Sequence, residues 1–431
     1  TTPEKNIRED IIMQDPSEPF CLDVEGGPDL SFDLKRRNRM VGYLTTFLVV
    51  MVLGTTEIFA SWYVGILGGT SLEAGVAMGA FGFTYMFSPA IGGRLSDRIG
   101  RKKTLVIATC AYIALLTSYL LPFIVPIHLI VIRVVEGFIF GFIAPTIQGM
   151  VAELEPGSET AALGNFSTSW SASMILPPMI LAYMVGAFGE VSSIYVVLAI
   201  ELLSLAIIGG FLQGYRRKTG EEDTDSIANR VASETTDGPT QSKTSPVFIA
   251  SYLSVMLWGV VSTIILALFP TYIEALIDLG HPFIREDFGN LLLIWNTVRT
   301  ISFIGTARMP GEYMKTVIVL GTILTAISGI LLFLFIDIWI FGLAMIISGI
   351  AVGFNYLGAL YLVVSATELE KGAHAGLVES MGGVGIFLGP IIGGWVMGFG
   401  LALPYLLYTV LAVVVLILIV LLLATREKPS V

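Results

Sequence analysis

Charge is scarce in this chain. Asp, Glu, Lys and Arg make up 13% of its 431 residues, whereas 55% are hydrophobic and the mean hydropathy is +0.82. Soluble domains carry about 25% charged residues, so the composition excludes an ordinary globular protein in water. Most of the molecular surface is therefore expected to face lipid.

Cysteine and histidine are rare as well. Cys21 lies in a polar N-terminal stretch and Cys110 in an apolar segment, so the sequence favours neither a disulfide framework nor a metal cluster. The three histidines, His128, His281 and His374, fall at the expected ends of apolar segments. We interpret them as surface residues rather than as a proton relay.

Motifs for nucleotide-driven or enzymatic chemistry are also missing. The chain has no Gly-x-x-x-x-Gly-Lys-Ser phosphate loop, which argues against an ATP-driven pump. It has no recognisable nucleophile triad or metal motif, so we expect no enzyme activity, no cofactor and no metal. Nothing in the composition favours a nucleic-acid partner.

Long apolar runs are what the chain has instead. A bilayer core of about 30 Å is crossed by about 20 apolar residues in a helix, and continuous rather than alternating runs favour helices over a barrel. We therefore predict an all-α integral membrane protein with twelve spans: 40–66, 71–93, 104–124, 126–150, 160–187, 192–213, 247–277, 286–306, 316–336, 338–364, 374–399 and 402–424.

A polar stretch divides these spans into two sets of six. Residues 215–246 are rich in Ser, Thr, Asp and Glu and begin with three basic residues, as expected of a linker. We predict five regions: a disordered acidic tail (1–38), a six-helix bundle (39–214), a linker (215–246), a second six-helix bundle (247–425) and a short tail (426–431). The N-terminal tail has nine acids among residues 1–34 against two cations, and such a composition favours disorder.

Basic residues indicate the orientation. Lys and Arg concentrate at 35–39, 94–103, 216–218, 308–315 and 426–428, all on one side if the twelve spans alternate. The positive-inside rule then places both termini in the cytoplasm of a plasma membrane or a bacterial or archaeal inner membrane. The acidic tail lacks the order of a cleavable signal peptide, so we expect insertion through the first span.

Weak internal similarity relates the two sets. Gly137-x-x-x-Gly141-Phe142 in the fourth span is matched by Gly349-x-x-x-Gly353-Phe354 in the tenth, and Glu153-Leu-Glu by Glu368-Leu-Glu. Parallel repeats of this kind predict two bundles related by a pseudo-twofold axis along the membrane normal, with a cargo site between them near mid-depth.

The segment between the second and third spans is the most specific motif. Residues 93–102 read Gly-x-Leu-x-Asp-Arg-x-Gly-Arg-Lys, interpreted as a charged tight turn. This pattern resembles the signature loop of the major facilitator superfamily, whose members move small solutes across membranes by alternating access. The resemblance implies a cytoplasmic latch formed by Gly93, Asp97, Arg98, Gly100, Arg101 and Lys102.

In that family the loop acid pairs with the N-terminus of the eleventh helix, which here lies near residues 372–376. Asp97 would fill this role, because a carboxylate is favourable at a positive helix end by about 0.3–2 kcal/mol. The corresponding segment of the second bundle, residues 305–312, lacks the acid. A symmetric second latch is therefore not expected.

Charges inside the fourth span form a second motif, Leu129-x-x-x-Arg133-x-x-Glu136-Gly137, similar to a pattern in the fourth helix of the family. An unpaired Arg in lipid costs at least a few kcal/mol, so Arg133 should face water or an acid. Counted from the outer helix ends, Glu57 lies level with it. In similar transporters such an acid and this Arg take part in proton coupling; the alternative is a purely structural pair.

Arg299 lies near mid-depth in the eighth span, one turn after Trp295 and Asn296. Its guanidinium could clamp a carboxylate or phosphate of the solute, or it could form an internal bridge to Glu379. Other candidate solute contacts sit on helices that usually line the cavity, although each residue type taken alone more often serves packing: Asn355, Tyr356 and Trp258.

Glycines predict close helix packing and bending in the eleventh span: Gly385, Gly389, Pro390, Gly393 and Gly394. A similar Gly-Pro motif occurs in the fifth helix of family antiporters, but here that helix reads Leu-Pro-Pro at 176–178. Glu201, inside the sixth span, either meets another helix or reaches the membrane surface.

The combined interpretation is a secondary transporter of a small organic solute, with protons as the coupling ion and a monomer as the working unit. In one hypothesis an organic anion binds Arg299 and is coupled through Glu57. In a rival hypothesis lipophilic or cationic compounds are exported in exchange for protons, with Glu57 or Glu136 binding the cargo. A transporter-like solute receptor is a third, weaker alternative.

Overall fold

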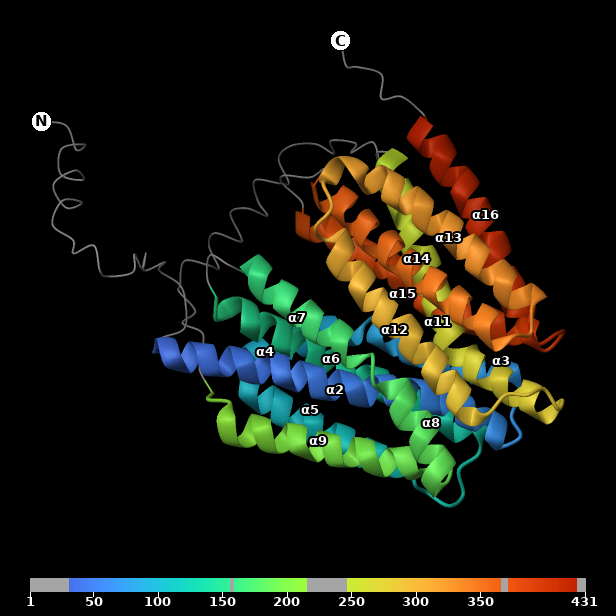
Figure 1. Cartoon of the computed structure of the whole chain (residues 1–431). Coiled ribbons are helices and arrows are strands. Elements are labelled where there is room, and N and C mark those ends of the chain that lie inside the picture. Colours follow the sequence, from blue (N-terminus) through green and yellow to red (C-terminus); the bar gives the residue numbers. More distant parts are fainter. Residues whose placement is uncertain (1–30, 156–158, 215–245, 366–370, 425–431) are drawn as a thin grey trace, which may run out of the picture.

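The computed structural model describes residues 31–155, 159–214, 246–365 and 371–424 (Figure 1). We call the helices before the linker the first bundle and those after it the second bundle. The first bundle contains α2 (Phe32–Ile66), α3 (Ser71–Tyr85), α4 (Ser88–Ile99), α5 (Arg101–Ser118), α6 (Pro126–Glu153), α7 (Glu159–Ser173), α8 (Pro177–Phe188) and α9 (Ser192–Phe211).

The second bundle contains α11 (Pro246–Asp278), α12 (Arg285–Thr306), the short 3-10 helix η1 (Gly311–Tyr313), α13 (Met314–Leu334), α14 (Ile338–Ser365), α15 (Lys371–Met397) and α16 (Leu403–Ala424). Nine helical segments within the described residues are long and apolar enough to cross a membrane. The twelve expected spans all occur as helices, so the predicted all-α membrane architecture is confirmed.

Two of the expected spans are broken by proline. The second divides at residues 86–87, where α4 restarts with Pro89 in its first turn, and the fifth divides at residues 174–176, just before Pro177 and Pro178. Proline has no N–H to donate and its ring clashes with the preceding turn, so it is favoured at the start of a helix. Pro145, by contrast, remains inside the continuous helix α6.

The signature segment is not the tight turn that we expected. Helix α4 continues to Ile99 and α5 begins at Arg101, so Gly100 alone separates two helices. Its φ of 98° is a conformation that glycine adopts without steric cost. Charged residues at the end of a membrane helix are solvated there, so the helix can continue through them.

The first helix is longer than expected, because α2 begins at Phe32 rather than near residue 40. Asn38 is fully buried and holds the end of the first bundle through two hydrogen bonds with the backbone of Gln213. The first turns of α2 therefore belong to the bundle rather than to the tail. The expected tail and linker otherwise lie outside the described residues.

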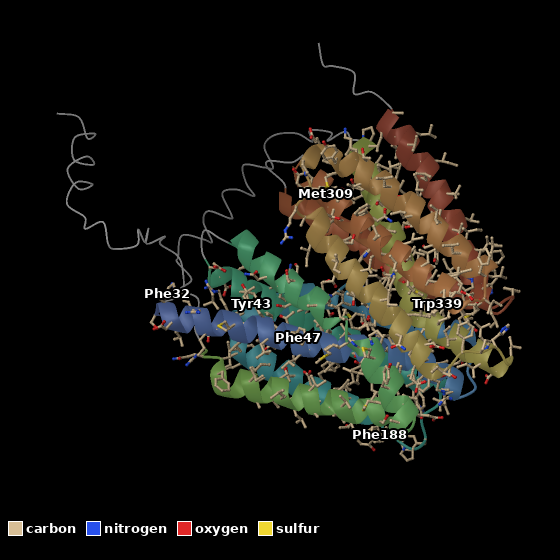
Figure 2. The ribbon with its side chains drawn as sticks, viewed as in Figure 1. Phe32, Tyr43, Phe47, Phe188, Met309 and Trp339 are labelled. Carbon is tan, nitrogen blue, oxygen red and sulfur yellow. The ribbon has the colours of Figure 1, made fainter. Side chains whose placement is uncertain are left out.

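Basic residues mark one end of the molecule, which we call the basic end: residues 35–39, 94–103 and 308–315. Phe32 and Met309 lie at this end, whereas Phe188 and Trp339 lie toward the opposite end (Figure 2). Phe188 and Trp339 are 74% and 84% exposed. Exposed aromatic side chains near helix ends are typical of the membrane–water boundary.

The two bundles meet away from the basic end. Helix α3 packs against α15, α8 against α12, and α2 against α11. Along α3, a Cβ added at Gly75 would overlap the carbonyl of Pro390, and one at Gly79 would meet the carbonyl of Phe387. Toward the basic end, where α2 begins, the helices of the two bundles diverge (Figure 1).

Candidate functional site

A buried charge cluster joins α2 and α6 near the middle of the first bundle. Arg133 and Glu136 are both 0% exposed and are one helical turn apart, with Arg133 Nη1 2.7 Å from Glu136 Oε2. Glu57 approaches the same guanidinium from α2, with its Oε1 3.6 Å from Arg133 Nη2. The structure thus brings together the three residues that the sequence had singled out.

Glu136 is held by a full set of donors. Besides Arg133, the hydroxyls of Thr56 and Tyr112 donate to its Oε1 at 2.5 and 2.7 Å, and the hydroxyl of Tyr119 donates to its Oε2 at 3.1 Å. The sequence did not identify these three residues as part of the site, because Thr and Tyr are common in membrane helices and nothing in their spacing indicates a shared partner.

Glu57 is held far more loosely. Its contact with Arg133 is longer than a hydrogen bond, and Arg133 Nε and Nη2 have no hydrogen-bond partner among the residues that the structure describes. The guanidinium instead lies over the ring of Phe81, 4.7 Å from its centroid. Glu57 is 8% exposed whereas Glu136 is 0% exposed. The two carboxyl groups therefore have different environments on either side of one cation.

Arg299 of α12 is the buried cation of the second bundle. It is 7% exposed, and its guanidinium lies 4.8 Å from the ring centroid of Trp295. Within the described part of the chain, its Nε has no hydrogen-bond partner. Arg299 and Glu57 interact electrostatically although they belong to different bundles. The alternative partner suggested by the sequence, Glu379, has a side chain outside the described residues.

Two hydroxyl groups connect the bundles beside Arg299. The Ser171 hydroxyl of α7 lies 2.9 Å from the Thr300 hydroxyl, which also approaches the Ser171 carbonyl at 3.2 Å. Asn296, one turn before Thr300, donates from its amide to the Leu292 carbonyl, while its Oδ1 has no partner. A buried polar strip on α12 thus faces the first bundle.

Asn355 lies elsewhere. It is 1% exposed, donates to the hydroxyl of Thr325, and its Oδ1 accepts from Ser254 and Thr322. These partners come from α11 and α13, so Asn355 joins three helices inside the second bundle. These bonds show a packing role for Asn355, and its role as a solute contact stays a prediction.

Trp258 and Tyr356 form an aromatic surface in the second bundle. Their ring centroids are 4.6 Å apart, and Tyr356 also packs against Phe303 at 5.8 Å. Both candidate residues are half-buried, and Trp258 Nε1 has no hydrogen-bond partner in the described residues. Aromatic faces with a free N–H suit a solute that has both apolar and hydrogen-bonding parts.

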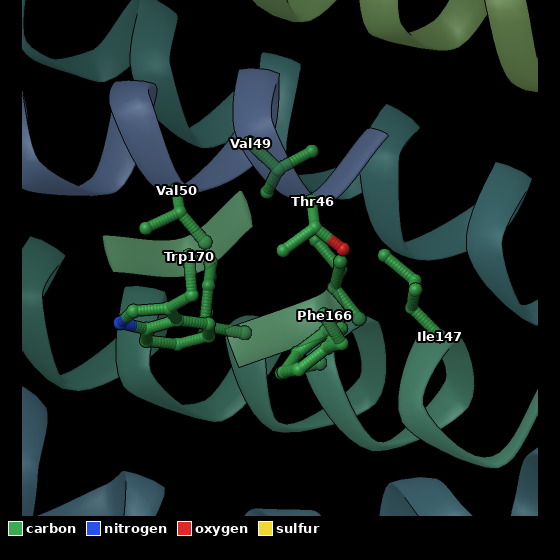
Figure 3. Close-up of a pocket in the computed structure, with 9 residues that line it drawn as sticks. Thr46, Val49, Val50, Ile147, Phe166 and Trp170 are labelled. Atoms are coloured by element: carbon green, nitrogen blue, oxygen red, sulfur yellow. The ribbon is translucent and has the colours of Figure 1, made fainter. Parts of the chain in front are cut away.

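A small pocket lies within the first bundle, between α2, α6 and α7 (Figure 3). Trp170 and Phe166 line one side and Thr46, Val49 and Val50 the other. Its cavity volume is about 10 Å³, the room that about one water molecule needs. Pockets for drug-sized ligands enclose about 300–1,000 Å³, so this pocket is too small to be the main solute site.

The signature residues interact within the first bundle. Arg101 pairs with Asp97 at 2.7 Å and with Glu153 at 2.5 Å, which ties α4, α5 and α6 together. Lys102 donates to the Gly209 carbonyl of α9. Arg98 is exposed, and Gly93 has open space around it. The side chains of residues 372–376, the expected target of Asp97, lie outside the described residues.

Polar contacts join the bundles at the opposite end. Trp62 of α2 donates from Nε1 to Glu274 Oε1 of α11 at 3.1 Å, and Glu274 also pairs with Arg285 of α12 at 3.0 Å. The hydroxyl of Tyr183 on α8 donates to Asn290 on α12 at 3.1 Å. None of these contacts was anticipated; Trp62–Glu274 and Tyr183–Asn290 link different bundles, and Glu274–Arg285 links two helices of the second bundle.

The glycines of α15 pack closely against neighbouring helices. An added Cβ would meet the Met256 carbonyl at Gly385, the Val260 backbone at Gly389, the Ile264 side chain at Gly393 and the Ser71 carbonyl at Gly394. Helix α15 remains continuous through Pro390. These residues therefore let α15 approach α11 on one side and α3 on the other.

The buried charges and the two packed bundles define a multi-pass membrane protein with a polar interface at its centre. The chain belongs to the Major Facilitator Superfamily, whose family model matches residues 42–310 and 311–431. This result confirms the family suggested by the signature motif. Several of the proteins it resembles are named as transporters.

Curated relatives match only part of the chain. Quinolone resistance protein NorA of Staphylococcus aureus is 27% identical over 146 residues, which are 33% of this chain and 37% of NorA. Probable anion transporter 2, chloroplastic, of Oryza sativa subsp. japonica is 29% identical over 158 residues, which are 34% of this chain and 28% of that protein. The chain thus spans about a third of the length of these relatives.

Solved structures match nearly the whole chain. Nucleoside transporter NupG has a TM-score of 0.69 and 15% identity, covering 91% of this chain and 100% of NupG. A bacterial homologue of the human lysosomal transporter Spinster has a TM-score of 0.71 and 13% identity, covering 93% and 100%. At such low identity these similarities establish the fold alone.

Proposed function

We propose that the protein is a secondary transporter that moves a small organic solute across a cell membrane by alternating access, coupled to protons. One observation carries the proposal: Glu57 and Arg299, opposite in charge and almost fully buried, interact across the interface between the bundles. Any rocking of one bundle against the other changes their separation. Protonation of Glu57 or binding of a solute at Arg299 would then bias the conformation.

Glu57 is the proton carrier in this proposal. Glu136 accepts four hydrogen bonds, from Arg133, Thr56, Tyr112 and Tyr119. Glu57 has one long contact with Arg133 and borders the interface. Neutralising Glu57 would therefore disrupt fewer contacts than neutralising Glu136. Glu136 then remains as the counter-ion of Arg133.

The solute class that fits Arg299 is a small organic anion. A guanidinium can donate to a carboxylate or phosphate through two parallel hydrogen bonds, and Arg299 Nε has no hydrogen-bond partner among the described residues. The partly exposed rings of Trp258 and Tyr356 would contact the apolar part of the solute. The names of two similar proteins, a probable anion transporter and the human organic anion transporter MFSD10, agree with this class.

A thermal-shift screen tests the solute class directly. The purified protein would be heated with organic anions, sugars, amino acids and lipophilic cations. A ligand at about 100 times its Kd stabilises a protein by about 2.7 kcal/mol, which is easily measured. We expect stabilisation by anions that is lost in Arg299→Ala and kept in the matched control Arg308→Ala, whose side chain is exposed.

Proton-driven export of lipophilic or cationic compounds is the second candidate. The similarity to quinolone resistance protein NorA favours it, as does the aromatic surface of Trp258, Tyr356 and Phe303. In this case Glu57 would bind the cargo. Stabilisation by lipophilic cations that survives Arg299→Ala but is lost in Glu57→Gln would establish export and discard the anion site.

The proposed orientation places the basic end in the cytoplasm of a plasma membrane or a bacterial or archaeal inner membrane, with the protein working as a monomer. The contacts at the opposite end then close the outer side, and the divergence of the bundles leaves the cytoplasmic side open. Asp97 pairs with Arg101 in this state. In the alternate state it would instead cap the N-terminus of α15, as the family motif implies.

A further inference from the structure

Asn296 is a buried side chain whose hydrogen-bonding groups are only half used. It lies on α12 one turn before Arg299 and is 1% exposed. Its Nδ2 donates to the Leu292 carbonyl at 3.0 Å, which fixes the orientation of the amide, because the reversed orientation would set two acceptor oxygens against each other. Its Oδ1 is then the free group, and no donor among the described residues reaches it. Such a buried acceptor is unfavourable until a donor is supplied.

Two neighbouring donors of α12 are already committed elsewhere. The Thr300 hydroxyl, one turn later, lies 2.9 Å from the Asn296 carbonyl and 3.2 Å from the Ser171 carbonyl. Trp295 donates from Nε1 to the Ser348 hydroxyl of α14 at 3.1 Å. Arg299 differs, because its Nε has no hydrogen-bond partner in the part of the chain that the structure describes. A free acceptor and a free donor therefore lie one turn apart without bonding each other.

Arg299 and Asn296 belong to the same part of the α12 surface. Residues three apart in a helix are neighbours on its surface, with Cβ atoms about 5–6 Å apart. The Arg299 guanidinium also folds back along the helix, since it lies 4.8 Å from the ring centroid of Trp295, the residue directly before Asn296. Trp295 is fully buried, and its bond to Ser348 holds the ring in place. The positive group and the free acceptor thus share one helical turn.

This turn of α12 faces the first bundle. Toward the basic end, the Thr300 hydroxyl contacts Ser171 of α7. Toward the opposite end, a Cβ added at Gly289 would meet the Ala182 side chain of α8 at 2.5 Å. With 3.6 residues per turn, Gly289, Asn296 and Thr300 lie within about 40° of one another around the helix. Asn296 is therefore enclosed between two places where the bundles touch, at the interface to which we assign the solute.

Exposure rises along the same side of α12 toward the basic end. Asn296 is 1% and Arg299 is 7% exposed, and Phe303, one turn later, is half-buried. Phe303 packs against Tyr356, so it continues into the aromatic surface that includes Trp258. A solute that enters where the bundles diverge would then place its polar head deepest, against Asn296 and Arg299, and its apolar part against these rings.

We propose that the solute is an organic anion with a hydrogen-bond donor, a hydroxyl or an ammonium group, on the carbon next to its carboxylate, and that Asn296 selects for this donor. The carboxylate accepts from Arg299, and the neighbouring hydroxyl or ammonium group donates to Asn296 Oδ1. One small polar head thus satisfies both unpaired groups. A plain carboxylate leaves the acceptor unpaired, and sites built to bond a donor reject analogues that lack it. The inference rests on the proposed anion site and narrows its solute class.

Equilibrium binding of two matched sets of acids to the purified full-length protein tests this inference. Propionate, lactate and alanine carry no donor, a hydroxyl and an ammonium group, respectively, on the carbon next to the carboxylate. The acids 3-phenylpropionate, 3-phenyllactate and phenylalanine repeat the comparison with an aromatic part. In each set that binds, we expect the hydroxyl or the ammonium acid to bind at least about tenfold more tightly than the plain acid. Comparing these two acids then shows which donor the site takes.

Asn296→Leu should reduce this preference to less than about twofold, because it removes the acceptor without adding a polar group. Asn290→Leu is the matched control, since it makes the same change on α12 six residues earlier, where the Asn290 side chain bonds Tyr183. It should keep the tenfold preference. Arg299→Ala should abolish binding of every acid in both sets.

The outcomes separate this inference from the proposed function. Equal binding of the three acids within a set, lost in Arg299→Ala, would overturn the donor requirement and leave the anion site standing. A preference that survives Asn296→Leu would overturn the role of Asn296. If no acid binds, or if binding persists in Arg299→Ala, the anion site itself fails and this inference with it. The wild-type comparison decides the donor requirement even if Asn296→Leu does not fold.

Discussion

At the scale of single residues, neighbouring charges in this protein have separate tasks. Glu136 is saturated with donors, Glu57 is nearly free of them, and Arg133 lies between the two. The sequence alone does not distinguish the roles of the two acids, because each is a charged residue within a long apolar segment. Their surroundings make one a structural counter-ion and the other a candidate for reversible protonation.

Replacing Glu57 by Gln should separate binding from energy coupling. Gln keeps the size of the side chain but cannot exchange a proton, so exchange of solute across proteoliposomes should continue while accumulation driven by a proton gradient is lost. The control is Glu190→Gln, an exposed acid at the opposite end. Full accumulation in Glu57→Gln would exclude Glu57 as the coupling group.

Replacing Glu136 by Leu should destabilise the protein instead. The change leaves the buried guanidinium of Arg133 without its closest partner and leaves the hydroxyls of Tyr112 and Tyr119 without an acceptor. Removing one member of a buried ion pair typically costs about 3–5 kcal/mol. A thermal unfolding scan measures the loss, and a Tm equal to that of the wild-type protein would contradict this role.

At the scale of elements, the interface between the bundles depends on backbone contact. Helix α3 presents Gly75, Gly79 and Gly82 to the backbone and side chains of α15 near Pro390. Small residues allow such close approach between membrane helices, where van der Waals packing is a principal source of association. Any side chain at Gly75 would hold the two helices apart.

Gly75→Ala should therefore weaken closure at the opposite end. Its Cβ would overlap the Pro390 carbonyl, and overpacking of this kind costs about 1–3 kcal/mol. We expect increased labelling of a cysteine placed at Tyr183, reporting a larger population open at that end. Gly305→Ala is the control, since a Cβ there meets nothing within 4 Å. Equal labelling in both variants would refute the role of this contact.

At the scale of the whole molecule, two bundles meet at one end and diverge at the other (Figure 1). The polar contacts Trp62–Glu274 and Tyr183–Asn290 join the bundles at the end where they meet. If transport requires rocking of the bundles, these contacts form in one state and break in the other. A covalent link in their place should stop the cycle.

Cysteines at positions 183 and 290, in a protein without its native cysteines, should allow this link through a short cleavable thiol crosslinker. Transport should fall when the crosslinker is added and recover when it is cleaved. A crosslink between positions 39 and 155, which pair within the first bundle, should leave transport intact. Transport at the normal rate with positions 183 and 290 linked would argue against rocking at this interface.

Much of the architecture was predictable from local patterns. Apolar length identifies membrane helices because the bilayer sets their minimum length, and the motif at residues 93–102 correctly indicated the family. The break at Pro177 and Pro178 could also have been anticipated from the missing N–H. The break before Pro89 was harder to foresee, because Pro145 stays inside a helix.

The sequence by itself determined that the chain is a helical membrane protein with buried charges on α2, α6 and α12, because both conclusions follow from the cost of placing polar groups in lipid. Only the tertiary structure decided the partners of those charges. Thr56, Tyr112 and Tyr119 meet Glu136, Asn355 joins three helices, and Glu201 is enclosed without a partner. Hydrogen bonds reach about 3 Å, so side chains distant in the sequence become partners only when the packing of helices brings them together.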